Sequence, residues 1–407
     1  MNVSRLILLL ISLTASSQAG DWPQILGPNR TGVADDETLV DRLPKSPKPL
    51  WSRDVGDGFA GVAIQNGTAF LFHRVGDQER VEAMEAKTGK VLWKSDSATD
   101  YHSQDTSDYG PRCPPVVTAD LVIVFGAQGL LRCLDRKTGE ELWANATQET
   151  FKTQEGYFGA GSTPVVEGNL VLVNVGAPKT RAGVVAFSLQ SGKVAWKATD
   201  EQPGYSSPLV ASVDGKRQAI FVTRYNCLGI EPKTGKVLWT FPFGARGPTV
   251  NAATPVLLGD RLFLTSSYGV GAVFAKLNSD SADQIWKDRN LMASQYTTPI
   301  EHDGALIGID GRQDIGPVSL RCLDPKSQKI LWDEKEFGYA TLIKADGKLL
   351  AQKTDGTLVL VSPDKMSYRE LSRAKLCEGT TRALPALSNG LYTLRNEETL
   401  FCYDFSR

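Results

Sequence analysis

Short apolar runs separated by turn residues recur along most of the chain. Residues 114–144 illustrate the pattern, with the runs PPVV, LVIVFG, LLRCLD and EELWA. Between them stand Ala-Asp, Ala-Gln-Gly and Arg-Lys-Thr-Gly, and Gly and Asp supply the backbone angles that tight turns need. Such a unit predicts four short β-strands joined by three turns. No stretch with helical periodicity is long enough to indicate a second domain.

The string Lys-Thr-Gly-x-x-Leu-Trp marks the end of these units. It occurs at residues 87–93, 137–143 and 233–239, and in looser form at 190–196 and 326–332. Seven of the eight tryptophans stand in register, at gaps of 42 to 53 residues: Trp51, Trp93, Trp143, Trp196, Trp239, Trp286 and Trp332. Four strands in about 45 residues is the period of a β-propeller blade.

Prolines mark the start of the same units. In five units a proline precedes the in-register tryptophan by 28 to 33 residues: Pro115, Pro164, Pro208, Pro255 and Pro299. Because proline cannot donate to a strand ladder, it belongs on a strand with a free edge. In a blade that strand is the innermost one, which lines the central channel. The segments just before these prolines are therefore predicted at the channel mouth.

The two chain ends complement each other. An eighth unit is indicated by Ser362-Pro363-Asp364 and the run 368–371, in which Leu371 replaces Trp. Residues 391–405 offer material for three strands without a final Trp strand, whereas Pro49–Ser52 is a final strand without partners before it. We predict an all-β, single eight-bladed β-propeller of four-stranded blades over residues 49–407, with seven blades as the alternative. The N- and C-terminal strands close the ring.

The first nineteen residues have a different character. Arg5 precedes the apolar run 6–13, and Ser17-Gln18-Ala19 offers small residues at cleavage-site positions. This pattern predicts a secretory signal peptide over residues 1–19, because the apolar run is too short to span a bilayer. No cysteine follows the run, so a lipoprotein anchor is not expected. We expect an exported, soluble monomer in the periplasm or cell envelope, with an extended segment over residues 20–48.

Composition and charge narrow the possible functions. The chain has 45 Lys+Arg against 46 Asp+Glu, which excludes an electrostatic nucleic-acid binder. The three histidines, His73, His102 and His302, have no zinc-binding spacing, so no metal site is predicted. After removal of the signal peptide no transmembrane segment is expected.

The six cysteines do not form a disulfide framework. Four occupy one repeat position, as in RCLD and FCYD, and are interpreted as small strand hydrophobes: Cys133, Cys227, Cys322 and Cys402. Cys113 and Cys377 lie outside that pattern. In an exported chain a bridge between those two stays an open alternative.

The D-x-x-T-G-x-x-L-W ending, as in Asp135–Trp143, resembles the pyrroloquinoline-quinone (PQQ) repeat of the quinoprotein alcohol dehydrogenase-like superfamily. Asp21–Gln24 and Gly27–Gly32 look like the N-terminal signature of exported bacterial PQQ-like propellers, and so does Arg395-Asn396 before the last strand. The resemblance covers residues 49–407. It also extends to the BamB-type propeller lipoprotein of the outer-membrane assembly machine.

The resemblance implies two different roles. Quinoprotein members hold PQQ with calcium on Glu, Asn and Asp oxygens, under an adjacent Cys-Cys disulfide and above a Trp. This sequence has no adjacent cysteines, and its in-register tryptophans fall on outer strands, so no catalytic residue is assigned. The first hypothesis is a non-catalytic propeller that needs no cofactor and binds a cell-envelope protein, peptide or glycan at its funnel. The alternative is a divergent PQQ-dependent oxidoreductase with calcium.

Residues just before the innermost strands are the candidates for a ligand surface. Tyrosine and arginine combine apolar area with directed hydrogen-bond donors, as a binding surface requires. The candidates are Tyr109, Arg112, Tyr157, Tyr205, Arg246, Asn251, Gln295, Tyr296, Tyr339 and Arg382.

Overall fold

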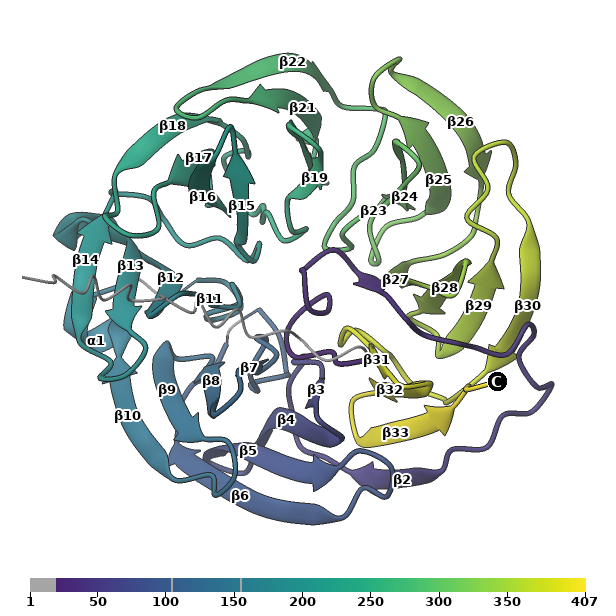
Figure 1. Ribbon diagram of the computed structural model, residues 1–407, viewed down its shortest axis with the longest axis horizontal. Coiled ribbons are helices and arrows are strands. Elements are labelled where there is room, and N and C mark those ends of the chain that lie inside the picture. Colours follow the sequence, from purple (N-terminus) through teal and green to yellow (C-terminus); the bar gives the residue numbers. More distant parts are fainter. Residues whose placement is uncertain (1–19, 104, 154–155) are drawn as a thin grey trace, which may run out of the picture.

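The computed structural model describes residues 20–103, 105–153 and 156–407. The predicted signal peptide lies outside the described residues. The chain forms a ring of eight antiparallel blades around a central channel, so the prediction of eight blades is confirmed and the seven-bladed alternative is wrong (Figure 1). In each blade the first strand lies at the channel and the last at the rim.

The first four blades follow one another along the chain. They consist of β3 (Ala63–Gln65), β4 (Thr68–Val75), β5 (Gln78–Glu85) and β6 (Val91–Ala98); β7 (Val116–Val117), β8 (Leu121–Phe125), β9 (Leu130–Asp135) and β10 (Glu141–Ala146); β11 (Val165–Glu167), β12 (Leu170–Ala177), β13 (Ala182–Ser188) and β14 (Val194–Ala198); and β15 (Leu209–Val213), β16 (Lys216–Val222), β17 (Asn226–Ile230) and β18 (Val237–Pro242).

The other blades complete the ring. They consist of β19 (Val256–Leu258), β20 (Arg261–Ser266), β21 (Gly271–Leu277) and β22 (Ala282–Asp288); β23 (Ile300–His302), β24 (Ala305–Asp310), β25 (Ser319–Asp324) and β26 (Lys329–Glu334); β27 (Ala340–Ala345), β28 (Lys348–Lys353), β29 (Thr357–Val361) and β30 (Glu370–Lys375); and β31 (Ala386–Ser388), β32 (Leu391–Arg395), β33 (Thr399–Asp404) and β2 (Trp51–Asp54). In the described part of the chain, helix is limited to α1 (Thr147–Phe151) and one 3-10 turn (Pro178–Thr180), and neither approaches the length of a membrane-spanning helix.

The eighth blade combines both ends of the chain, as predicted. β2 pairs antiparallel with β33, so that Trp51 lies opposite Cys402 and Asp54 opposite Thr399. Residues 391–405 form two strands rather than three, because the innermost strand of this blade, β31, comes from upstream. The outermost strand of the seventh blade carries no Trp. The predicted replacement, Leu371, is the bulge residue of this strand, and Ser372 occupies the Trp position opposite Leu360, as Trp332 does opposite Cys322 in the sixth blade.

The repeated tryptophans pack one blade against the next. A Cβ atom on Gly139 would lie 2.4 Å from Cε3 of Trp93 in the preceding blade, and Trp93 Nε1 donates to the Arg136 carbonyl at 3.0 Å. Gly139 has a φ of +75°, so both space and backbone conformation require glycine there. The Lys-Thr-Gly turn is thus the surface on which the neighbouring indole rests.

Trp239 departs from this arrangement. The following blade has no Lys-Thr-Gly turn, and Trp239 Nε1 donates instead to Gln218 Oε1 at 2.7 Å within its own blade. Gln218 Nε2 then donates to the Asn278 carbonyl of the next blade at 2.8 Å. A buried amide therefore replaces the direct contact between indole and turn.

The two faces of the ring differ in their connections. Since the strands of a blade alternate in direction, every innermost strand begins at the same face, here named the loop face, and ends at the opposite one, the turn face. Longer loops cross the loop face to reach each innermost strand, and the five repeat prolines directly precede β7, β11, β15, β19 and β23, as predicted. The Lys-Thr-Gly turns lie on the turn face.

Residues 20–34, here named the N-terminal hairpin, cross the middle of the ring (Figure 1). Because Trp22 runs antiparallel to an innermost strand and β1 runs parallel to one, the chain enters the channel from the turn face and returns to it. Trp22 runs antiparallel to β3 and exchanges two backbone hydrogen bonds of 2.8 Å with Ile64. The returning strand β1 (Val33–Ala34) pairs in parallel with β27, with Val33 beside Lys344. With the Pro23 carbonyl, which accepts from Val117 of β7 at 2.8 Å, the hairpin therefore adds protein backbone to the inner edges of three blades.

Arg30 stands at the tip of the hairpin. Its side chain is buried, with 3% of the residue exposed, and it donates to the carbonyls of Thr163 and Pro164 and, at 2.9 Å, of Pro208. Burial lowers the pKa of Arg30 to about 9. These carbonyls lie where β11 and β15 begin, so the hairpin tip closes the channel beneath the loop face.

All six cysteines are buried and free. Cys133, Cys227, Cys322 and Cys402 lie on the third strands of their blades, which confirms their interpretation as strand hydrophobes. The open alternative of a bridge between Cys113 and Cys377 is not realised.

Candidate functional site

The residues predicted at the channel mouth lie in loops of the loop face. Each stands between the last strand of one blade and the innermost strand of the next. Their side chains nevertheless differ in environment: some are hydrogen-bonded inside the fold, and others are open to solvent.

Asn251 and Tyr339 hold loops in place. Asn251 is 3% exposed, and its Nδ2 donates to the carbonyls of Thr223 at 2.9 Å and Phe243 at 3.1 Å. Tyr339 is 4% exposed, and its hydroxyl accepts from the backbone N–H of Tyr296 at 2.7 Å. Because their polar groups are used inside the fold, these two residues position the surface rather than form it.

Tyr205 and Tyr296 are half-buried walls. The Tyr205 hydroxyl accepts from the Phe158 N–H at 2.8 Å, and Tyr296 donates to Gln313 Oε1 at 3.0 Å. Burial raises the pKa of both tyrosines. Each therefore stays neutral, and its hydroxyl is held by a loop of the fold.

The first open group surrounds Phe59, which lies in the loop after β2. The guanidinium carbon of Arg112 lies 4.8 Å from the Phe59 ring centroid, and that of Arg382 lies 5.3 Å from it. Arg112 is ion-paired with Asp108 at 2.5 Å. Arg382 is exposed and has no ion pair among the described residues, so it offers an uncompensated charge beside an aromatic ring.

The second open group is centred on Arg224, in the loop between β16 and β17. Its guanidinium carbon lies 5.1 Å from the Tyr157 ring and 5.3 Å from the Tyr225 ring. Nε donates to the Tyr225 hydroxyl at 2.8 Å. Arg246, on the neighbouring loop, is exposed and has no ion pair among the residues described.

The third open group combines Tyr268 and Arg312. The guanidinium carbon lies 4.4 Å from the Tyr268 ring, Gln295 Nε2 donates to the Tyr268 hydroxyl at 3.0 Å, and Arg312 pairs with both oxygens of Asp314. Tyr268 and Arg312 border a cavity of about 320 Å³ between the fifth and sixth blades. Ile315 at its rim is 57% exposed.

Sequence reasoning missed Arg224, Tyr225, Tyr268 and Arg312. These residues lie between the second and third strands of their blades, and the strand order places those turns on the loop face as well. The alternation of strand direction could therefore have indicated that these turns join the loop face. Phe59 was missed because its segment lacks the repeat proline.

Tyr109 belongs to a tighter region between the first two blades. Its ring centroid lies 4.9 Å from that of His102 and 6.0 Å from the guanidinium carbon of Arg74. Nearby, Glu79 on β5 is 2% exposed and its Oε1 accepts from the Ala127 N–H at 2.7 Å, which ties the first blade to the second. Burial raises the pKa of Glu79 to about 7.

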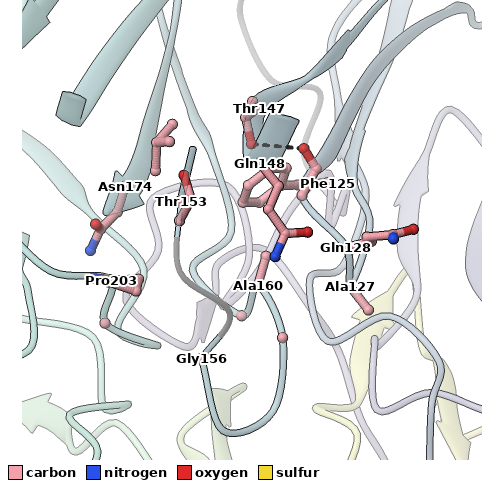
Figure 2. Close-up of a pocket in the computed structure, with 15 residues that line it drawn as sticks. Phe125, Ala127, Gln128, Thr147, Gln148, Thr153, Gly156, Ala160, Asn174 and Pro203 are labelled. Atoms are coloured by element: carbon pink, nitrogen blue, oxygen red, sulfur yellow. Dashed lines mark hydrogen bonds between the residues drawn. The ribbon is translucent and has the colours of Figure 1, made fainter. Parts of the chain in front are cut away.

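A narrow cleft lies between the second and third blades (Figure 2). Thr147 Oγ1 donates to the Gly129 carbonyl at 2.7 Å on one side, and Asn174 and Pro203 form the other. The cavity measures about 30 Å³, which is room for about one or two waters. It cannot hold a cofactor.

The donor set does not fit PQQ with calcium. No cluster of three or more His, Cys, Asp or Glu side chains suited to a metal occurs among the described residues. The cysteines are unpaired, the seven in-register tryptophans pack on outer strands, and the Arg30 tip fills the channel below the funnel. The residues around the channel therefore do not reproduce the quinone site that the resemblance implies.

The eight-bladed ring with tryptophans on outer strands defines the class as a PQQ-like β-propeller. The family model described as outer membrane protein assembly factor BamB matches residues 77–334, more than half of the chain, and the chain belongs to this family.

Individual relatives come from two branches. The quinohemoprotein alcohol dehydrogenase ADH-IIG of Pseudomonas putida is 25% identical over 301 residues, which cover 67% of this chain and 37% of the relative. Outer membrane protein assembly factor BamB of Burkholderia pseudomallei is 24% identical over 258 residues, covering 60% of this chain and 61% of the relative. The chain thus spans less than two thirds of either relative.

The crystal structure of BamB from Moraxella catarrhalis superposes with a TM-score of 0.63 at 15% identity, covering 88% of this chain and 97% of that one. At this identity the likeness concerns the fold alone.

Proposed function

We propose that this chain is an exported, non-catalytic propeller that binds a protein of the cell envelope through its loop face. The observation that carries the proposal is the display of three arginine–aromatic groups, around Phe59, Arg224 and Tyr268, on one face. Arginine and tyrosine dominate the energetics of protein interfaces because they pair apolar area with directed donors.

The loops that carry these groups are preorganised. Asn251 and Tyr339 fix the loop backbones with buried hydrogen bonds, so little conformational entropy is lost when a partner binds. The relatives named as outer membrane assembly factors support a partner in the cell envelope. A peptide or glycan ligand would use the same surface.

Site-specific photo-crosslinking tests this proposal. A photoreactive phenylalanine is placed at Arg382 and Arg246 on the loop face, and at Leu92, which is 49% exposed on the outermost strand β6 and serves as the control. After irradiation of intact cells we expect one defined protein adduct from positions 382 and 246 and none from position 92. Equal adducts from all three positions, or none from 382 and 246, would contradict the proposal.

A divergent quinoprotein oxidoreductase is the second candidate, because ADH-IIG is 25% identical over two thirds of this chain. It predicts a saturable, calcium-dependent complex with PQQ and dye-linked alcohol oxidation by the purified protein. Absence of both would eliminate it.

A further inference from the structure

The N-terminal hairpin covers only part of the channel wall. Trp22 pairs with β3, the Pro23 carbonyl accepts from Val117 of β7 at 2.8 Å, and the Gly32 carbonyl accepts from Lys344 of β27 at 2.8 Å. On the other side, the channel edges of β11, β15 and β19 have no backbone partner among the described residues. An unpaired strand edge offers N–H and C=O groups to another strand.

A cavity of about 440 Å³ lies between these free edges and the tip of the N-terminal hairpin, where Pro28–Thr31 line its other side. Its wall includes Val166, Val210 and Leu257, which occupy the same position in three consecutive blades, two residues after the repeat proline. All three are half-buried. Towards the turn face the cavity ends at Glu167 and Arg217, which form two hydrogen bonds of 2.8 and 2.7 Å. Its volume lies within the range of ligand sites in proteins.

We propose that this half of the channel binds an extended peptide segment of a partner protein, with small β-branched side chains and no proline. The segment pairs through its backbone with the free edge of β15 or an adjacent innermost strand, and its side chains contact Val166, Val210 and Leu257. The chain's own hairpin supplies the precedent, because β1 adds to the inner edge of β27 in the same manner. This site lies at the other end of the channel from the loop face.

The geometry favours a strand over a helix. A helix with side chains is about 10 Å across and satisfies its own backbone groups, so it would leave the three edges unpaired. An extended segment satisfies one edge and places alternate side chains on the apolar wall. Glu167 and Arg217 neutralise each other, so the occupant needs no net charge where it passes them.

The test is a titration of the purified protein with the peptide acetyl-Val-Thr-Val-Thr-Val-amide, followed by NMR of Val and Leu methyl groups. We expect saturable shifts of the Val166, Val210 and Leu257 methyls at about 1 mM peptide or below, with those of Leu92 and Leu142 unchanged. A peptide N-methylated on alternate residues should bind about tenfold more weakly, because it cannot donate along one edge.

Two variants separate this site from others. Val210→Trp fills the cavity and should abolish the shifts of the Val166 and Leu257 methyls. Ala211→Leu narrows the cavity and should abolish the shifts of all three wall residues, whereas Arg382→Ala on the loop face should leave them unchanged. No shift at the three wall residues, or equal binding of the N-methylated peptide, overturns the proposal, the latter pointing to an apolar small molecule. Concentration-dependent self-association that blocks the peptide also overturns it, because the occupant is then a second copy.

Discussion

Substitution of one turn glycine tests whether the tryptophan repeat holds the ring together. We consider Gly139→Ala, on the turn face of the second blade. The new Cβ would meet Cε3 of Trp93 at 2.4 Å and Cδ2 at 2.7 Å, so the indole of the preceding blade must move. That movement weakens the 3.0 Å hydrogen bond from Trp93 Nε1 to the Arg136 carbonyl.

Two contributions add to the expected loss of stability. An alanine at the φ of +75° found for Gly139 costs about 1–2 kcal/mol, because its Cβ crowds the following carbonyl. Displacement of the packed indole costs about 1–3 kcal/mol more. The free energy of unfolding should therefore fall by about 2–5 kcal/mol, summing those two ranges.

Gly168→Ala is the matched control. Gly168 also lies in a turn of the turn face, with a φ of +58°, but nothing lies within 4 Å of its Cβ position. Only the backbone cost of about 1–2 kcal/mol applies to it. Urea unfolding followed by far-ultraviolet circular dichroism measures both variants. Equal losses for Gly139→Ala and Gly168→Ala would refute the packing role of the Trp–Gly contact.

Substitutions at three further residues have definite expected outcomes. Glu79 has a folded pKa of about 7 against an ordinary value of 4.5, so the folded state binds more protons between these pH values and stability falls as pH rises from 4.5 through 7. Glu79→Gln should remove this loss of stability, which is on the order of 3 kcal/mol in total. Urea midpoints at pH 5 and 8 measure it, and an unchanged difference between the two pH values would contradict the assignment. Trp51→Phe keeps a ring near Gly89 but loses the 3.0 Å hydrogen bond to the Ala86 carbonyl, so the free energy of unfolding should fall by about 1 kcal/mol. Trp51→Ala should lower it by about 3 kcal/mol or more and speed hydrogen exchange of β2. Identical effects of the two variants would argue against ring closure by indole packing. Arg30→Ala leaves three channel carbonyls without their donor, and it should increase hydrogen exchange at Trp22 and Lys344 without altering that of β22; unchanged protection would show that the tip does not hold the hairpin.

The fold could be predicted from the sequence because the contact that packs neighbouring blades recurs along the chain. Four of the indoles rest on a glycine turn of the next blade, so that Trp93 and Gly139, for example, record the same contact from two sides. Leu371 and the lone strand at Trp51 then indicated the eighth blade and the closure. A contact that recurs with a regular period can be inferred from the sequence alone.

Features that occur once were not predictable in this way. Nothing in Gly27–Gly32 has strand periodicity, so the route of the hairpin into the channel required the structure. Tyr339 and Tyr157 look alike in sequence, yet the hydroxyl of Tyr339 accepts from backbone N–H groups and the ring of Tyr157 lies against Arg224. Which role a loop tyrosine takes depends on neighbours from other blades.

We propose that the loop face is a protein-binding surface and not a quinone pocket. A thermal-unfolding titration of the purified protein with PQQ, with and without calcium, distinguishes the two. A ligand at a hundredfold its dissociation constant stabilises a protein by about 2.7 kcal/mol. We predict an unchanged unfolding midpoint at every PQQ concentration in both conditions. A saturable rise of the midpoint that requires calcium would overturn this proposal and identify a quinoprotein.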